Sequence, residues 1–197
     1  MRSAEEKIIE AARILFTQKG FSAIKTRDIA KKAGINIALL NYYFRSKEKL
    51  FEIVSRKNFG EFIQIISKIV NEEKTDIWQK IELLVKNYIE MLSLNPDMPL
   101  FVLTQTKLDP HRMKMRQKII ESYFMKQVQL AIKSGEINPI NPNQLIMNIM
   151  SLTIFPFAGR HIIQNNNGIS PREFDKCMQE RKKMIPIWIK AILKAKT

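Results

Sequence analysis

The sequence of 197 residues is poor in cysteine, histidine and glycine, and each shortage argues against a class of protein. Its one cysteine, Cys177, cannot form a disulfide within the chain, so nothing indicates an oxidising compartment. His111 and His161 are the only histidines, and neither lies in a metal-ligand spacing. The 6 glycines form no phosphate-binding loop or nucleophile elbow. We therefore expect a protein that is not an enzyme and has no metal site and no cofactor.

A targeting signal is also missing from the start of the sequence. Residues 1–7 are polar and charged, whereas a secretory signal peptide continues into an apolar run after its basic start. We expect a cytoplasmic protein that takes no part in a membrane.

Acidic residues are few relative to basic ones. The chain has 33 Lys and Arg against 19 Asp and Glu, which gives a formal net charge of +14. The first 50 residues hold 11 of the basic residues and only 5 of the acidic ones. This excess suits a polyanionic partner, with nucleic acid favoured over an anionic membrane surface.

Apolar residues recur at helical spacing along the chain, and alternating strand patterns are scarce. We predict an all-α fold of about nine helices. Ser3 and Glu6 have the spacing of a capping box that opens the first helix, and Gly20 follows its end. We divide the chain into an N-terminal three-helix domain, residues 1–48, and a C-terminal helical domain, residues 49–197.

Capping and proline signals predict the later helix boundaries. A long helix is expected to start after Ser46, and later helices are expected at residues 76–95, 97–107, 110–135, 141–156 and from residue 171 onward. Asn141 and Gln144 have capping-box spacing. Pro156 is expected to kink or break its helix, and Pro186 to bend or interrupt the last one.

The stretch TRDIAKKAGINIALLNYYFRSKEK, residues 26–49, indicates two short helices joined by a tight turn, with a third helix directly after them. Thr26 can cap the first helix and Gly34 can end it, while Asn36 can cap the second. The second helix then places Leu40 inward and leaves a polar and aromatic face outward. This is the geometry of a helix-turn-helix, whose second helix enters the major groove of DNA. An ordinary helical hairpin is the alternative.

Three segments in this order, LFTQKGF, TRDIAKKAGI and YYFRSKEKLF, resemble the DNA-binding domain of the TetR/AcrR family of bacterial transcription regulators. The resemblance covers the first 50 residues, and beyond them it extends only to helix number and length. It implies an all-helical homodimer that binds a double-stranded DNA operator. It also implies a C-terminal domain that holds a pocket for a small-molecule effector.

The resemblance assigns phosphate contacts at the edges of the motif. Thr26 matches a first-turn contact to a phosphate, and Lys47 matches a lysine that neutralises a backbone phosphate. Lys25 and Arg27 flank Thr26 and either add phosphate contacts or are simply solvated. Tyr42 matches an aromatic position that the family uses on phosphates and bases.

The resemblance also assigns positions that approach the bases. Asn36 either reads a base edge or only caps its helix, and Ile37 and Ala38 can contact a thymine methyl group. Two residues depart from the family pattern: Asn41 replaces a common tyrosine and Tyr43 replaces the usual histidine. We expect operator preference to differ most at these two positions.

The C-terminal domain gives weaker predictions. Aromatic, sulfur-containing and polar residues of its middle helices are expected either to line an effector pocket or to fill ordinary core: Tyr88, Met91, Phe101, Gln105, Arg116, Tyr123, Phe124, Met147 and Phe155. Two apolar helices are expected either to form the dimer interface or to pack within one protomer. The residues chosen for the interface are Leu145, Asn148, Leu152, Phe174, Met178, Ile185, Trp188 and Ile189.

These observations predict a homodimeric repressor that a small apolar or amphipathic ligand releases from a pseudo-palindromic operator. The alternative is a DNA-binding protein of the same fold whose C-terminal domain binds a protein partner rather than a small molecule.

Overall fold

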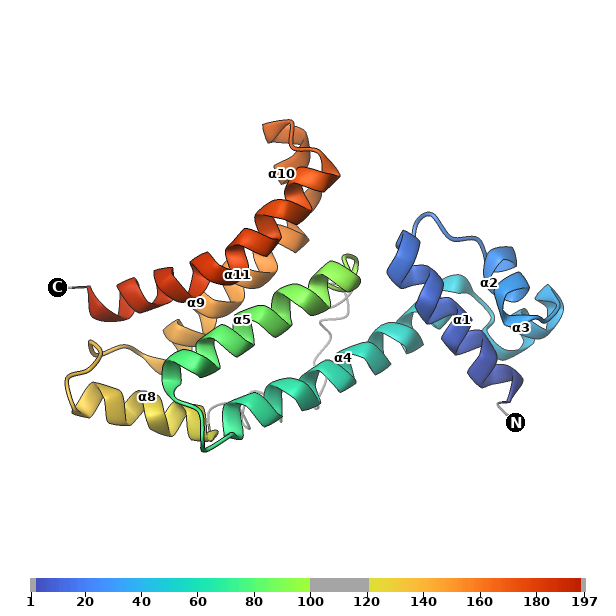
Figure 1. Ribbon diagram of the computed structural model, residues 1–197. Helices are drawn as coiled ribbons and strands as arrows, with labels where there is room; N and C mark the ends of the chain where they lie inside the picture. The colour runs from blue at the N-terminus through green and yellow to red at the C-terminus, as the bar shows by residue number, and fades with distance from the viewer. Residues whose placement is uncertain (1–2, 100–120, 196–197) are drawn as a thin grey trace.

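The structure, a computed structural model, describes residues 3–99 and 121–195. Within these ranges it contains nine helices and no strand, which confirms the predicted all-α fold (Figure 1). The helices are α1 Ala4–Lys19, α2 Thr26–Ala33, α3 Ile37–Phe44, α4 Lys47–Asn71, α5 Ile77–Leu94, α8 Tyr123–Lys133, α9 Pro142–Ala158, α10 Arg160–Asn167 and α11 Pro171–Lys194.

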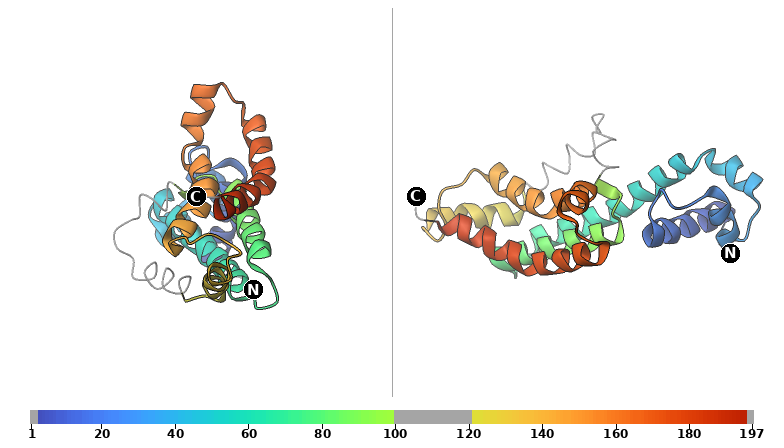
Figure 2. Two further views of the ribbon diagram at one scale, coloured as in Figure 1. Left: turned by 90° about the vertical axis from the view of Figure 1, so that its left-hand side faces the viewer. Right: turned by 90° about the horizontal axis from the view of Figure 1, so that it is seen from above.

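The molecule is elongated, with α1, α2 and α3 gathered at one end (Figures 1 and 2). We call this end the head and the assembly of α5, α8, α9, α10 and α11 the body. Helix α4 starts in the head and runs along the body beside α5 and α8. The C-terminus lies at the end of the body that is far from the head (Figure 1).

Two hydrophobic cores divide the chain, and α4 contributes to both. Leu50 and Val54 of α4 are buried in the core of the head, whereas Phe62, Ile66 and Val70 are buried in the core of the body. The predicted domain boundary after residue 48 falls in the first turn of this helix and remains a prediction.

Short-range capping signals give most helix starts. The Ser3 and Glu6 capping box is present, and Ser46 caps α4 by accepting a hydrogen bond from the Lys49 N–H. Ser170 and Glu173 form a further capping box at the start of α11. These predictions are confirmed because each depends only on residues within one helical turn.

Two predictions about helix starts are corrected. Thr26 is the first residue of α2 rather than its cap, because the extended residue before it is Lys25, whose N–H donates to the Asp28 carboxylate. Asn141 caps α9, but its side chain accepts from the Asn143 N–H and forms no capping box with Gln144.

A further correction concerns a longer helix, and two internal prolines do not interrupt the helices that contain them. A helix over residues 110–135 does not run unbroken, since Ser122 caps a new start at α8. Residues 100–120 lie outside the described ranges, and with them most of the predicted helix over 97–107. Helix α9 passes through Pro156 and ends at Gly159, where α10 turns away by 66°. Helix α11 likewise continues through Pro186.

Arg181 explains how α9 accommodates a proline. Pro156 has no N–H to donate to the carbonyl of Leu152 one turn earlier. The Arg181 guanidinium, from α11, donates to that carbonyl over 2.8 Å. Burial lowers the pKa of Arg181, and the side chain also stacks over the ring of Trp188. A side chain from another helix therefore replaces the missing backbone hydrogen bond.

Residues 137–159 carry no charged side chain and include all of α9. In the described part of the chain, no single helix is long and apolar enough to span a bilayer, although the bent pair α9 and α10 together meets the length and composition test.

Replacing Arg181 tests whether its hydrogen bond to the Leu152 carbonyl stabilises α9. Arg181→Met is expected to lower the free energy of unfolding by about 1–3 kcal/mol, because the partly buried Leu152 carbonyl loses its donor. In a Pro156→Ala background the backbone N–H is restored, so the same substitution should cost less. Urea denaturation of the wild type, the two single variants and the double variant gives the free-energy cost of Arg181→Met in each background. Equal costs would contradict this role of Arg181.

Candidate DNA-binding surface

Helices α2 and α3 are fixed by side chains that point into the core of the head. Ile29 and Ala30 of α2 are buried there, as are Leu40 and Phe44 of α3. Gly34 joins the two helices with a φ of 68°, a left-handed conformation that a residue with a side chain adopts at a cost. The opposite face of α3 is thereby turned to solvent.

The outer face of α3 carries the residues expected to approach DNA. Ile37, Ala38, Asn41, Tyr42 and Tyr43 are all exposed. Tyr42 is 79% exposed, and its ring meets that of Tyr43 edge-on at 5.5 Å. The predicted orientation of this helix is confirmed, and an exposed helix with these side chains can enter a major groove. The contact of each residue with a base or phosphate remains a prediction.

Asn36 forms the N-cap of α3. Its side-chain oxygen accepts a hydrogen bond from the Leu39 N–H at 2.7 Å. The capping role is therefore present, and the residue is exposed. Its oxygen accepts the cap hydrogen bond, and the side-chain NH₂ group can still donate to a base.

The N-terminus of α2 presents cationic side chains to solvent. Lys25 and Arg27 are exposed, and Thr26 lies between them, half-buried, in the first turn. Unpaired N–H groups at a helix start favour a phosphate oxygen. This arrangement is compatible with the predicted phosphate contacts.

The Lys47 side chain does not extend freely into solvent, as a lysine that contacts only phosphate would. Its ammonium donates to the carbonyls of Phe21 and Ile24, each at 3.0 Å, and lies 4.1 Å from the centre of the Phe21 ring. Two of its three N–H donors are thus used within the head. A phosphate contact by Lys47 would rely on the remaining donor.

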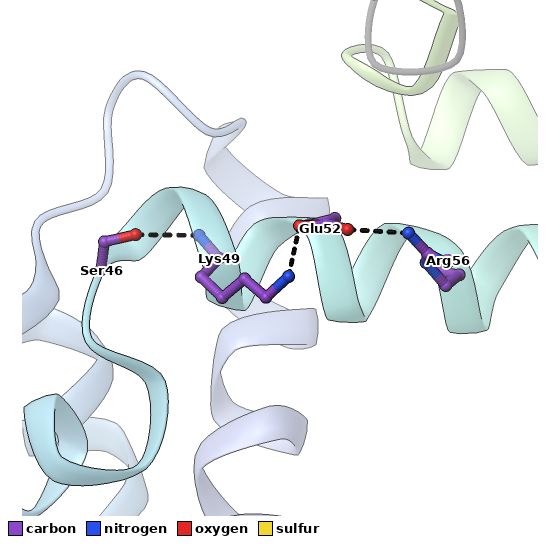
Figure 3. Close-up of polar contacts among 4 residues, drawn as sticks. All are labelled: Ser46, Lys49, Glu52 and Arg56. Atoms are coloured by element: carbon purple, nitrogen blue, oxygen red, sulfur yellow. Dashed lines mark hydrogen bonds and ion pairs between the residues drawn. The ribbon is translucent and has the colours of Figure 1, made fainter. Parts of the chain in front are cut away.

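The structure adds charged residues that the sequence analysis did not select. Arg45 links α3 to α4, is exposed, and has a φ of 59°, which is uncommon for a residue other than glycine. In α4, the Glu52 carboxylate lies between Lys49 at 2.9 Å and Arg56 at 2.7 Å (Figure 3). The hydrogen bond from Lys49, together with Arg56, lowers the pKa of Glu52. The sequence signal for these ion pairs was the spacing of three residues between Lys49 and Glu52 and of four between Glu52 and Arg56.

The predicted pocket residues do not come together as one set. Tyr88 and Phe124 line a cavity of about 40 Å³ between α4, α5, α8 and α9, and burial raises the pKa of Tyr88 to about 12. Met91 packs against the same core, and the Tyr123 ring lies 5.3 Å from the ammonium of the buried Lys80. The remaining residues are placed differently: Met147 and Phe155 are exposed, and Phe101, Gln105 and Arg116 lie outside the described ranges.

Most residues predicted for the dimer interface are buried within one protomer. Five of them belong to the core of the body: Leu145, Phe174, Met178, Ile185 and Ile189. Asn148, Leu152 and Trp188 are half-buried. Exposed apolar side chains of the same region include Phe155, Ile162, Met184 and Ile187. Helical spacing identified apolar helices but did not distinguish their two faces.

A hollow of about 630 Å³ lies between α9, α10 and α11. Its apolar lining includes Ile163, Met184 and Trp188. The Arg181 Nε atom is buried at this site and has no hydrogen-bond partner among the residues that the structure describes. In the described part of the chain, no three His, Cys, Asp or Glu side chains are grouped to hold a metal ion.

Comparison with known proteins supports the interpretation of the head as a DNA-binding domain. Residues 8–54 match the family described as "Bacterial regulatory proteins, tetR family". The probable HTH-type transcriptional regulator YttP of Bacillus subtilis is 28% identical over 204 residues, which cover 98% of this chain and 95% of YttP. The HTH-type transcriptional regulator RutR of Escherichia coli O157:H7 is 30% identical over 160 residues, covering 77% of this chain and 73% of RutR.

The fold of the whole chain is also similar to that of a solved regulator. The crystal structure of FadR from Bacillus subtilis, in complex with stearoyl-CoA, is 20% identical and has a TM-score of 0.52. The likeness covers 91% of this chain and 96% of FadR. At this identity it shows that the fold is shared.

Tyr42 provides a test of the exposed face of α3. Tyr42→Ala is expected to weaken binding to a duplex enriched from a random pool by about tenfold, the loss of one good contact. The melting temperature should stay the same, because the side chain packs little against the protein. Fluorescence anisotropy titration measures the affinity, with Leu130→Ala, at an exposed position of α8, as the control. Unchanged affinity would place Tyr42 outside the interface.

Proposed function

The chain belongs to the TetR/AcrR family of bacterial DNA-binding transcriptional regulators, and we propose that it is a homodimeric repressor that a small apolar or amphipathic compound releases from a pseudo-palindromic operator. It is a regulator and not an enzyme, as its relatives are. The observation that carries the proposal is the exposed face of α3, held outward by the buried Leu40 and Phe44.

The exposed apolar side chains of the body support a dimer. Phe155, Ile162, Met184 and Ile187 lie on α9, α10 and α11, the three helices that bound the hollow of about 630 Å³, and Met184 lines it. A cluster of large apolar side chains left in water indicates an interaction surface. A second copy, related by a twofold axis, can bury this surface and fill the hollow. It can also supply an acceptor for the Arg181 Nε–H, which has none within residues 3–99 and 121–195.

Dimerisation determines the form of the operator. A twofold dimer presents two α3 helices, which must enter successive major grooves about 34–36 Å apart. The half-sites are then inverted copies of one sequence. The exposed Lys25 and Arg27 at the start of α2 and Arg45 directly after α3 add positive charge to the head, which favours contact with phosphate before bases are read.

The body supports an apolar or amphipathic effector. The cavity beside Tyr88 and Phe124 is bounded by apolar side chains from four helices, and a ligand that widens it would separate them. FadR, which shares the fold, was solved with stearoyl-CoA, so acyl-CoA thioesters are the first compounds to test. A ligand releases DNA only if it binds more tightly to a conformation of the dimer in which the distance between the two α3 helices does not match the operator than to the DNA-bound conformation.

Ile187 provides a test of the dimer. Ile187→Glu is expected to give monomers, because it places a charge in the proposed apolar interface. Ile65→Glu is the matched control, since Ile65 is 45% exposed on α4 and Ile187 is 59% exposed on α11. Sedimentation velocity measures the assembly state. A dimer that persists in Ile187→Glu would exclude this face as the interface.

Effector release is tested on the complex of the protein with its selected duplex. Stearoyl-CoA is expected to dissociate the complex at concentrations at which coenzyme A alone does not, because the acyl chain supplies the apolar contact. Electrophoretic mobility shift measures the bound fraction. If acyl-CoA thioesters and other amphipathic compounds bind but leave the DNA complex intact, the induction mechanism is refuted.

A further inference from the structure

Phe21, in the turn between α1 and α2, is held from two distant parts of the chain. Its backbone N–H donates to the carboxylate of Asp97, beyond the end of α5, over 2.7 Å. Its carbonyl accepts from the ammonium of Lys47, the first residue of α4, over 3.0 Å. The Phe21 ring packs against Phe51 at 4.7 Å and lies under the same ammonium. One residue of the head is therefore bound to both α4 and the end of α5.

The approach of Asp97 to this turn depends on Gly20. A side chain at that position would place its Cβ 3.2 Å from an Asp97 carboxylate oxygen, which is tighter than ordinary packing. The φ of Gly20 is 75°, a conformation that residues with a side chain rarely adopt. The turn is thus shaped so that a carboxylate from the body can reach its backbone.

A second hydrogen bond fixes the segment that carries Asp97. The Asn95 side-chain oxygen accepts from the Asn58 side chain of α4 at 3.0 Å. The Asn95 amide group donates to the Met91 carbonyl in the last turn of α5. Asp97 is therefore anchored to α5 and to the middle of α4 before it contacts the head. A displacement of the end of α5 would be passed to Phe21.

We propose that Asp97 is a positioning residue that sets the orientation of the reading helix α3 relative to the body, acting through Phe21 and Lys47. Lys47 begins α4 three residues after α3 ends, so a shift of Phe21 acts on the junction of the two helices. A hydrogen bond to a charged group is stronger than one between neutral groups, which suits Asp97 to this task. The inference rests on the proposed function, because in a dimer this orientation determines the distance between the two α3 helices.

The expected consequence is a loss of discrimination between operator spacings. The wild-type protein should prefer its selected operator over the same duplex with one base pair inserted between the half-sites. Asp97→Ala should reduce this preference about tenfold, because the heads are then less constrained. Asp97→Asn keeps an acceptor oxygen and should retain more of the spacing preference than Asp97→Ala does. Glu73→Ala, at an exposed position after α4, removes the same charge without touching the turn and should change nothing.

The experiment measures the affinity of each variant for both duplexes and for a single half-site. An equal loss of affinity for all three duplexes in Asp97→Ala would show a purely structural role and overturn the inference. Asp97→Glu keeps the hydrogen bond on a side chain one methylene longer, and a changed spacing preference in this variant supports the inference even if Asp97→Ala does not fold. An unchanged preference in Asp97→Ala would overturn it, and if Asp97→Ala does not fold, an unchanged preference in both Asp97→Glu and Asp97→Asn would do the same. A wild-type protein without any spacing preference would instead refute the proposed dimeric function.

Discussion

The structure depends on one helix that belongs to two hydrophobic cores. Leu50 and Val54 bury one end of α4 in the head, and Phe62, Ile66 and Val70 bury the other end in the body. Because the helix is continuous from Lys47 to Asn71, the two cores are connected by a rigid element rather than a linker. The reading helix directly precedes it, so the position of α3 follows from how α4 is packed.

Polar contacts of a few residues supplement these cores where backbone groups would otherwise be unpaired. Arg181 serves the Leu152 carbonyl that Pro156 leaves free, and Lys47 serves two carbonyls in the turn after α1. Lys80 is fully buried, and its ammonium donates to the Thr75 carbonyl at 2.7 Å in the turn after α4. In each case the cationic group of a long side chain donates a hydrogen bond to a backbone carbonyl that has no helical N–H donor. Lysine and arginine side chains thus contribute to the fold itself.

The candidate site was predictable to the extent that it is local. The reading helix, its cap at Asn36 and its exposed face all follow from residues within a few positions of one another. Lys47 shows where such inference ends, because its ammonium is bound by carbonyls 23 and 26 residues earlier in the chain. The dimer prediction shows the same limit. Periodicity identified α11 as apolar, but burial of Ile185 and exposure of Ile187 depend on which face meets α5.

The sequence by itself determined the helical class, most helix starts and the helix-turn-helix, because caps and helical periodicity act over one or two turns. Only the tertiary structure decided that α9 continues through Pro156, since the compensating donor, Arg181, comes from another helix. It likewise decided the contact of Asp97 with Phe21, which spans 76 residues. No local pattern encodes such a contact, because it exists only when two separate cores have fixed the elements that carry its two partners.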